Sequence, residues 1–171
     1  MIDKKWTELK ILKYFSLDYL DINVSDLSAE EQEEKHKQWD KACEEYNDYI
    51  TENEGLFSKA FLKEYRNGGF HDYRILQIKS EFTESGALNV AVELAHKGYR
   101  YLLISKDVVR SSFSIDNQDK SILSGNYLYG EYYKDKNGFW NHNFMLGCRE
   151  CDITAKKFVF KKQKENNSSI S

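Results

Sequence analysis

The chain has 171 residues, with 25 Lys and Arg side chains against 28 Asp and Glu, so its formal net charge is −3. This length fits one domain, and a content of 40% hydrophobic and 15% aromatic residues is enough for a core, which excludes disorder for most of the chain. No apolar run approaches the ~20 residues that a membrane span needs, and residues 1–6 lack the apolar stretch of a signal peptide. We therefore expect a cytoplasmic protein that does not bind a membrane.

Three cysteines, Cys43, Cys148 and Cys151, are an odd number in a chain without a secretion signal, so we expect reduced thiols. Cys148 and Cys151 enclose a predicted hairpin turn, where zinc knuckles do occur, but structural zinc needs four ligands. The sequence therefore predicts no metal and no cofactor, and it leaves open whether this pair binds a metal ion.

The N-terminal third of the chain carries helical patterns. Residues 6–22 combine apolar side chains at helical spacing with local alternation, which predicts a helix and leaves a strand as the alternative. Ser28 and Glu31 form a capping-box pattern, which predicts a helix start. An apolar stripe continues this helix to about residue 51 and consists of Trp39, Ala42, Cys43, Tyr46, Tyr49 and Ile50.

A second apolar stripe runs from Phe57 to Tyr65 and predicts an adjacent helix that ends at Gly68, where glycine suits a C-cap. After Gly69 the hydrophobic period changes from 3.6 to 2, which indicates half-buried strands. Turn residues at hairpin spacing separate these strands, and no connection is long enough for a parallel crossover. The expected strand segments are 76–82, 88–94, 99–104, the less regular 108–115, 127–133, 139–146 and 153–160.

These patterns predict an α+β fold in which N-terminal helices pack on an antiparallel meander sheet of six to seven strands. We expect residues 1–164 to form one domain, with a helical part at 1–68 and the sheet at 69–164. Residues 165–171 are expected to form a disordered tail.

Three short motifs carry a resemblance to known proteins: residues 13–20, the Phe-His-Asp-Tyr-Arg-Ile segment at 70–75, and Tyr-Leu-Tyr-Gly-Glu at 127–131. In their order along the chain they resemble small uncharacterised bacterial proteins classed as a domain of unknown function. Some bacterial toxin-immunity proteins are similar in sharing the hydrophobic-His-Asp opening and the Tyr-Leu-Tyr-x-Glu strand. The similarity covers about residues 10–160; it implies a fold and brings no established activity.

Four residues are candidates for catalysis. His71 and Asp72 open a predicted strand; metal-dependent phosphohydrolases with an adjacent His-Asp pair resemble helical bundles with further ligands, so bonds to nearby backbone groups are the favoured interpretation here. Glu131, which is expected to share a face with Tyr127, and His142 are polar groups on predicted apolar faces. Burial would raise the pKa of the carboxyl and lower that of the imidazole, as happens both in catalytic sites and in satisfied cores. One hypothesis is that these four side chains converge at one end of the sheet.

Charge is unevenly placed along the chain. Residues 26–54 hold 11 acidic side chains against three lysines, a net of −8, and the rest of the chain is +5. Such a field can steer a basic partner, although a charge run on a helix also serves solubility. Two tyrosines beside the acids are predicted to anchor an interface. The predicted binding residues are Glu30, Glu31, Glu33, Glu34, Glu44, Glu45, Tyr46 and Tyr49.

The sequence thus favours a non-enzymatic interaction domain, immunity-like by resemblance, that binds a basic protein partner through its acidic helices. Nucleic acid binding is disfavoured at the acidic segment, and Lys157 and Lys161 suit the protection of an edge strand. The alternative is a hydrolase or small-ligand-binding domain with a pocket around His71, Asp72, Glu131, His142 and the strand that carries Tyr127 and Tyr129. No motif establishes catalysis, and the partner and the oligomeric state stay open.

Overall fold

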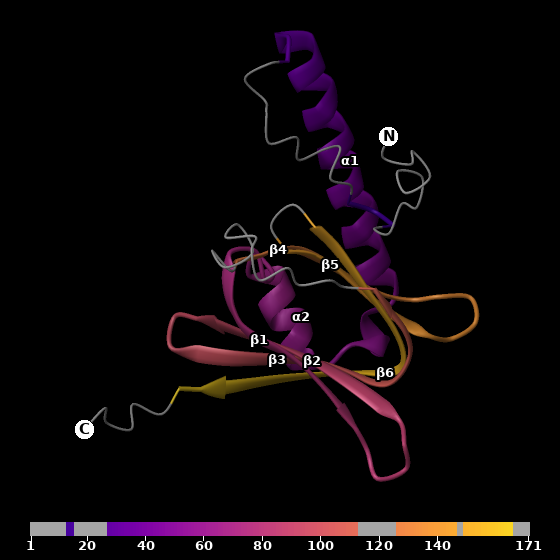
Figure 1. Cartoon of the computed structure of the whole chain (residues 1–171). Coiled ribbons are helices and arrows are strands. Elements are labelled where there is room, and N and C mark those ends of the chain that lie inside the picture. The colour runs from indigo at the N-terminus through magenta and orange to yellow at the C-terminus, as the bar shows by residue number, and fades with distance from the viewer. Residues whose placement is uncertain (1–12, 16–26, 113–125, 147–148, 166–171) are drawn as a thin grey trace, which may run out of the picture.

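The structure is a computed structural model, and it describes residues 13–15, 27–112, 126–146 and 149–165. Within these ranges the chain forms two α-helices, one 3-10 turn and six strands (Figure 1). Every strand pair is antiparallel, so the predicted α+β class with an antiparallel sheet is confirmed. The elements are α1 (Ala29–Glu52), η4 (Glu54–Leu56), α2 (Lys59–Arg66), β1 (Tyr73–Phe82), β2 (Leu88–His96), β3 (Tyr99–Ser112), β4 (Asn126–Lys134), β5 (Trp140–Leu146) and β6 (Arg149–Lys164).

The six described strands close into a barrel in the order β1-β2-β3-β6-β5-β4. Two three-stranded meanders, β1–β3 and β4–β6, are joined by a long ladder between β3 and β6 and a short one between β1 and β4. The sheet is thus meander-like within each half, but it does not stay open. Strand β6 pairs with β5 only up to Ala155, so in the described part of the chain Lys157 and Lys161 lie where β6 pairs with β3 alone, and their interpretation as protection of an edge strand stays a prediction.

The segments predicted at 99–104 and from 108 onward form the single strand β3, which explains six described strands instead of seven. Its pairing with β6 shifts register between Val108 and Arg110, and Asp107 has a positive φ of 53°. This local irregularity breaks the alternation that the sequence shows. Residues 113–115 lie outside the described part of the chain.

Helix α1 begins where the capping box predicts. The Ser28 hydroxyl accepts the N–H of Glu31 at 3.3 Å, and the Glu31 carboxylate accepts the N–H of Ser28 at 2.8 Å. The buried residues of α1 are Ala42, Tyr46 and Ile50, all in its second half. Figure 1 shows that the first half of the helix runs on beyond the strands. The helix therefore packs on the barrel through its C-terminal half.

Helix α2 supplies the central aromatic ring of the core. Phe61 is fully buried, and its ring centroid lies 5.1 Å from that of Tyr132 and 5.7 Å from those of Phe158 and Phe160. The Ser58 hydroxyl caps this helix by accepting the N–H of Phe61. The core is consequently built largely from aromatic side chains of the helices and of the barrel interior.

Two expectations concern parts of the chain that are mostly not described. Of residues 6–22, the structure describes 13–15, so the choice between helix and strand stays open. The expected tail at 165–171 lies outside the described residues except for Glu165. Among the described helices, none has the length and apolar character needed to cross a membrane.

Candidate functional site

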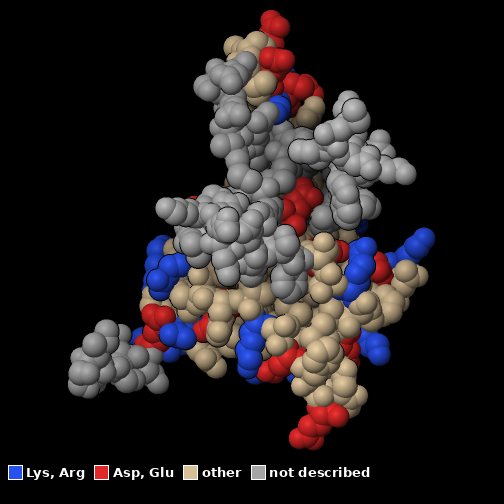
Figure 2. Space-filling view, viewed as in Figure 1, with Lys and Arg blue, Asp and Glu red and all other residues tan. Residues whose placement is uncertain are grey.

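The first half of α1 is an acidic helix that faces solvent. Its residues 29–38 carry four Glu side chains against two Lys, a net of −2, and the whole helix carries nine Asp and Glu side chains against three Lys. Residues 29–38 contribute nothing to the core, since each is exposed or half-buried. Figure 2 shows carboxylate side chains gathered at the end of the molecule formed by this half-helix. The fold therefore holds negative charge away from the barrel.

Some of the predicted binding carboxylates have partners within α1. The hydrogen bond from the Ser28 N–H lowers the pKa of Glu31, which makes Glu31 part of the helix cap. Glu33 pairs with Lys37 at 2.8 Å, but exposed pairs of this kind contribute little free energy. The other predicted acids are exposed: Glu30, Glu34, Glu44 and Glu45.

The two tyrosines predicted as interface anchors are engaged inside the molecule. Tyr46 is 1% exposed, and its hydroxyl accepts the N–H of Tyr132 and donates to the carbonyl of the same residue. Tyr49 is half-buried, and its hydroxyl accepts the N–H of Lys134 at 2.8 Å. The prediction that a partner desolvates Tyr46 is wrong, because the apolar stripe of the helix turns this ring onto the barrel.

A pocket of about 240 Å³ lies beside the middle of α1. Its wall combines α1 with the turn after α2 and the start of β4. Aromatic rings form most of this wall: Phe15, Trp39, Tyr46, Tyr65, Phe70, Tyr127 and Tyr129. The other lining residues are Cys43, Asn47, Gly68, Gly69, His71 and Gly130.

His71 lies at this pocket, with Asp72 next to it. The Nδ1 atom of His71 is 2.7 Å from a carboxylate oxygen of Asp72, and the imidazole lies 4.6 Å from the ring of Tyr129. The Asp72 N–H donates to the carbonyl of Tyr127 at 2.9 Å, which helps to place the start of β1 beside β4. Both side chains are exposed and pair with each other, not with backbone groups as the favoured interpretation expected.

Glu131 anchors the segment that precedes α1. Its carboxylate is fully buried and accepts the N–H groups of Lys13 at 2.8 Å, Tyr14 at 2.6 Å and Phe15 at 2.6 Å. Burial raises the pKa of Glu131 to about 7, although these three bonds act in the opposite direction. The carboxylate therefore holds residues 13–15 against the outside of β4.

His142 lies inside the barrel. Its Nε2 atom is 3.1 Å from the hydroxyl of Tyr127, which is also bonded to the hydroxyl of Tyr132. Burial lowers the pKa of His142 to about 3. Its Nδ1 atom has no hydrogen-bond partner among the described residues. The imidazole is therefore a neutral core group.

A register shift in β4 explains why these groups face different ways. Between Tyr127 and Gly130 the pairing with β5 is irregular, so Tyr127 points into the barrel like Tyr132, while Glu131 points outward. A Cβ atom at Gly130 would overlap the Tyr127 hydroxyl, so the ring of Tyr127 can lie there only because residue 130 is glycine. The expectation that Tyr127 and Glu131 share a face is wrong for this reason.

The four catalytic candidates do not form one site. Of His71, Asp72, Glu131 and His142, only His71 lines the pocket. In the described part of the chain, no group of three or more His, Cys, Asp or Glu side chains is placed to hold a metal ion. The hypothesis that these four residues converge is therefore wrong.

Cys43 is a free thiol. Cys43 lines the pocket, and burial, followed by the charge of Asp40, raises its pKa, so the thiol stays protonated at neutral pH. Cys151 is buried in the core. Because Cys148 lies outside the described residues, metal binding by Cys148 and Cys151 stays open.

Glu64 on α2 is a buried carboxylate that the sequence pattern did not single out as a site residue. Glu64 accepts hydrogen bonds from the hydroxyls of Tyr73 at 2.9 Å and Tyr101 at 3.1 Å, and from the ammonium of Lys162 at 2.8 Å. Burial alone would raise the pKa of Glu64, but these donors outweigh it and lower the pKa. Its position three residues after Phe61 places it on the buried side of α2, and this spacing could have identified Glu64 as a buried carboxylate.

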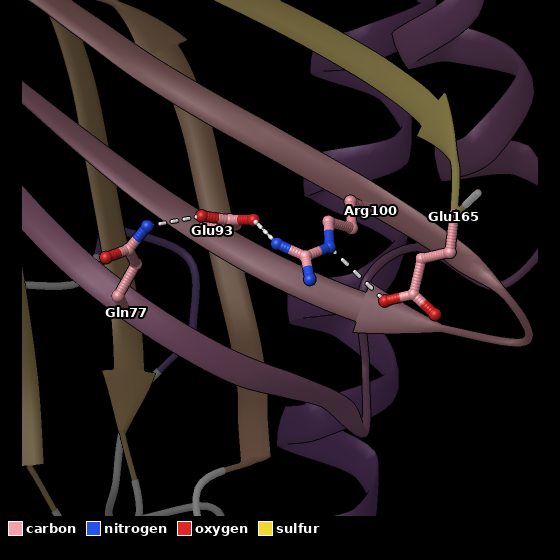
Figure 3. Close-up of polar contacts among 4 residues, drawn as sticks. All are labelled: Gln77, Glu93, Arg100 and Glu165. Carbon is pink, nitrogen blue, oxygen red and sulfur yellow. Dashed lines mark hydrogen bonds and ion pairs between the residues drawn. The ribbon is translucent and has the colours of Figure 1, made fainter. Parts of the chain in front are cut away.

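A second polar cluster lies on the outer face of the barrel (Figure 3). Glu93 on β2 accepts a hydrogen bond from Gln77 on β1 at 2.5 Å and pairs with Arg100 on β3 at 2.9 Å. Arg100 also reaches Glu165, which follows β6, at 3.3 Å. Figure 3 shows the guanidinium between the two carboxylates, so this cluster links four segments of the barrel and leaves its charges paired.

Comparisons of the chain with protein-family models, with curated proteins and with solved structures found no match. The resemblance to bacterial domain-of-unknown-function and immunity proteins therefore stays a prediction.

Proposed function

We propose that this protein is a non-enzymatic interaction domain that binds a basic protein partner through the first half of α1. The observation that carries the proposal is the placement of residues 29–38, an acidic helical segment that contributes nothing to the core and extends beyond the strands. Half-helices of this length gain little stability from their own backbone bonds. Packing therefore does not explain why the charge is held there, whereas attraction of a basic surface does.

The mechanism is electrostatic steering followed by docking. A surplus of carboxylates on a projecting element raises the local concentration of cationic surfaces and speeds their encounter. Exposed charges are screened over about 8 Å at physiological ionic strength, so the association rate should fall as salt is added. The barrel serves as the rigid base that fixes the direction of α1.

The test reverses charge without touching the helix cap. The triple variant Glu30→Lys, Glu33→Lys and Glu34→Lys leaves the Ser28–Glu31 capping box in place. A matched control makes the same change of charge at exposed residues outside this half-helix: Glu52→Lys, Glu81→Lys and Glu84→Lys. Wild type and both variants are used as baits in lysate of the source cell, and retained proteins are identified by mass spectrometry.

We expect a basic protein that wild type and the control retain and the triple variant loses. With that protein purified, the association rate should fall on the order of tenfold in the triple variant, and its dependence on salt should weaken. Equal retention and equal rates for all three baits would overturn the proposal.

The hydrolase alternative has less support. Of its four residues, only His71 lies at the pocket, while Glu131 binds the backbone of residues 13–15 and His142 lies in the barrel interior. The pocket is therefore better explained as a binding surface for part of the partner.

A further inference from the structure

We infer that the aromatic pocket beside α1 receives an arginine side chain of the basic partner. The inference rests on the proposed function and names the chemical group that the partner supplies. It concerns the 240 Å³ pocket between α1, the turn after α2 and the start of β4.

The pocket is lined by closely spaced rings. The centroid of Trp39 lies 4.5 Å from that of Tyr129 and 5.0 Å from that of Phe15, and the centroids of Tyr46 and Tyr65 are 5.7 Å apart. Aromatic rings carry negative charge on their faces and attract cations within about 6 Å, with Trp the most effective. A pocket of this composition suits a group that is both flat and cationic.

The charges around the pocket have the sign that a cation requires. Among its described lining residues there is no Lys or Arg. The Cys43 thiol is neutral because burial and Asp40 raise its pKa. The carboxylate of Asp72 is paired with the lining residue His71 and, after burial, is the next cause that raises the pKa of Tyr129. These groups make the pocket complementary to a positive side chain.

The same molecule already binds ammonium groups with tyrosine clusters. The ammonium of Lys13 lies 4.6 Å from the ring of Tyr14, 5.1 Å from that of Tyr133 and 5.5 Å from that of Tyr49. In that cluster the fold supplies its own cation. In the pocket, the described residues provide the rings without the cation, so the partner is the source that completes the arrangement.

Arginine fits better than lysine for two reasons. A guanidinium is planar, stacks on aromatic faces and is less strongly hydrated than an ammonium, so entering an apolar pocket costs it less. Asn47, a residue of the lining, also carries a hydrogen-bond acceptor, because its side-chain oxygen accepts from the Tyr65 hydroxyl at 2.6 Å. A carbonyl-type oxygen has a second lone pair for a guanidinium N–H.

The experiment uses a pair of peptides that differ in charge and hardly in shape. Acetyl-Gly-Arg-Gly-amide and the same peptide with citrulline, the neutral isostere of arginine, are titrated into wild-type protein. The readout is the indole N–H resonance of Trp39, assigned with the Trp39→Phe variant. The indole of Trp140, which packs on Phe57 and Phe158, is the internal reference.

We expect the arginine peptide to shift the Trp39 resonance saturably and to leave Trp140 unchanged. The citrulline peptide should bind about tenfold more weakly, since it lacks the cation–π attraction. Tyr129→Leu should weaken binding of the arginine peptide, and Tyr99→Leu, a half-buried tyrosine outside the pocket, should not. Equal shifts from both peptides, or no shift of Trp39, would overturn the inference even if the variants failed to fold.

The outcomes separate this inference from the proposed function. The triple variant at residues 30, 33 and 34 leaves the pocket lining intact, so it should bind the short arginine peptide within about threefold of wild type, because screened charges at that distance act weakly. If the arginine peptide binds at Trp39 but charge reversal does not change binding of the partner, the inference about the pocket holds and electrostatic steering is wrong. If charge reversal abolishes binding of the partner but the peptide does not shift the Trp39 resonance, electrostatic steering holds and the inference about the pocket is wrong.

Discussion

The barrel and the first half of α1 follow different physical rules. In the barrel, buried polar groups such as Glu64 and Glu131 are each surrounded by donors, because a lone buried charge would cost several kcal/mol. In residues 29–38 the carboxylates face water and contribute nothing to the core. Substitutions should therefore affect stability in the barrel and association at the helix. The four predictions below test this division.

The largest expected effect is the loss of folding stability in acid that follows from the burial of His142. Its pKa is about 3 in the folded chain, against an ordinary value of 6.5, so the unfolded chain takes up a proton first. Stability that is present above pH 6.5 is lost as the pH falls towards 3. At about 1.4 kcal/mol per pKa unit, the interval amounts to about 5 kcal/mol, and about 2 kcal/mol is already lost at pH 5.

The His142→Phe variant removes this titration. Urea unfolding of wild type and variant, measured from pH 7.5 down to pH 5 and below, should show the variant gaining relative stability as the pH falls. The control is His36→Phe, which removes an exposed imidazole of the projecting half-helix. An unchanged difference between His142→Phe and wild type across this range would show that His142 is not held neutral by burial.

Gly130→Ala is expected to cost about 3 kcal/mol of unfolding free energy, as overpacking of a rigid site does. The new methyl group would overlap the Tyr127 hydroxyl, so either the ring or strand β4 must move. Gly55→Ala is the matched control, because nothing lies within 4 Å of a Cβ at that position. The check is urea unfolding at pH 7.5, and similar midpoints for the two variants would contradict the close packing of Tyr127 on Gly130.

Glu131 should show the opposite pH dependence to His142. Its pKa is raised from 4.5 to about 7 in the folded chain, so the folded chain binds the proton more tightly. The stabilisation is complete below pH 4.5 and is lost as the pH rises through 7. Between pH 8 and pH 5.5 wild type should gain about 2 kcal/mol over Glu131→Gln. The titratable groups that face Glu131 keep one state in this window, since the pKa of Lys13, of Tyr46 and of Tyr133 is raised.

The measurement is the unfolding free energy of both proteins at each pH, with Glu84→Gln on an exposed turn as the control. A difference between wild type and Glu131→Gln that stays constant from pH 8 to pH 5.5 would contradict the burial of an ionisable carboxyl. A difference that is constant in this window and shrinks only below about pH 4.5 would show that the three backbone bonds dominate.

The sequence predicted the local structure better than the closure of the barrel. Alternation in residues 88–94 correctly places Val90, Val92 and Leu94 inside and Glu93 outside. The ladder between β3 and β6 joins segments about 50 residues apart and leaves no short-range pattern. The reversed face of Tyr127 has the same kind of cause, because one irregular pairing moves a side chain to the other side of the sheet.

The candidate site was predictable in part. The count of charged residues identified the acidic helix, and Glu30 and Glu34 are exposed in the structure, as a binding surface requires. Tyr46 could have been excluded as an anchor, since it belongs to the same apolar stripe as Ala42 and Ile50. Of the residues expected around a pocket, His71, Tyr127 and Tyr129 line it. The rest of the lining could not be predicted, because it comes mostly from the segment at 13–15 and from both helices, which only the tertiary structure brings together.

The smallest expected effect lies in the projecting half-helix. Glu34→Ala removes one exposed hydrogen bond from Gln38 at 2.9 Å, so the unfolding free energy should change by less than about 0.5 kcal/mol. The same substitution should still slow association with the basic partner, because each carboxylate contributes to the field. Unfolding in urea and stopped-flow association measure the two effects on one sample. A loss of more than about 1 kcal/mol would mean that this half-helix is held by packing, and the division between a stabilising barrel and a binding helix would fail.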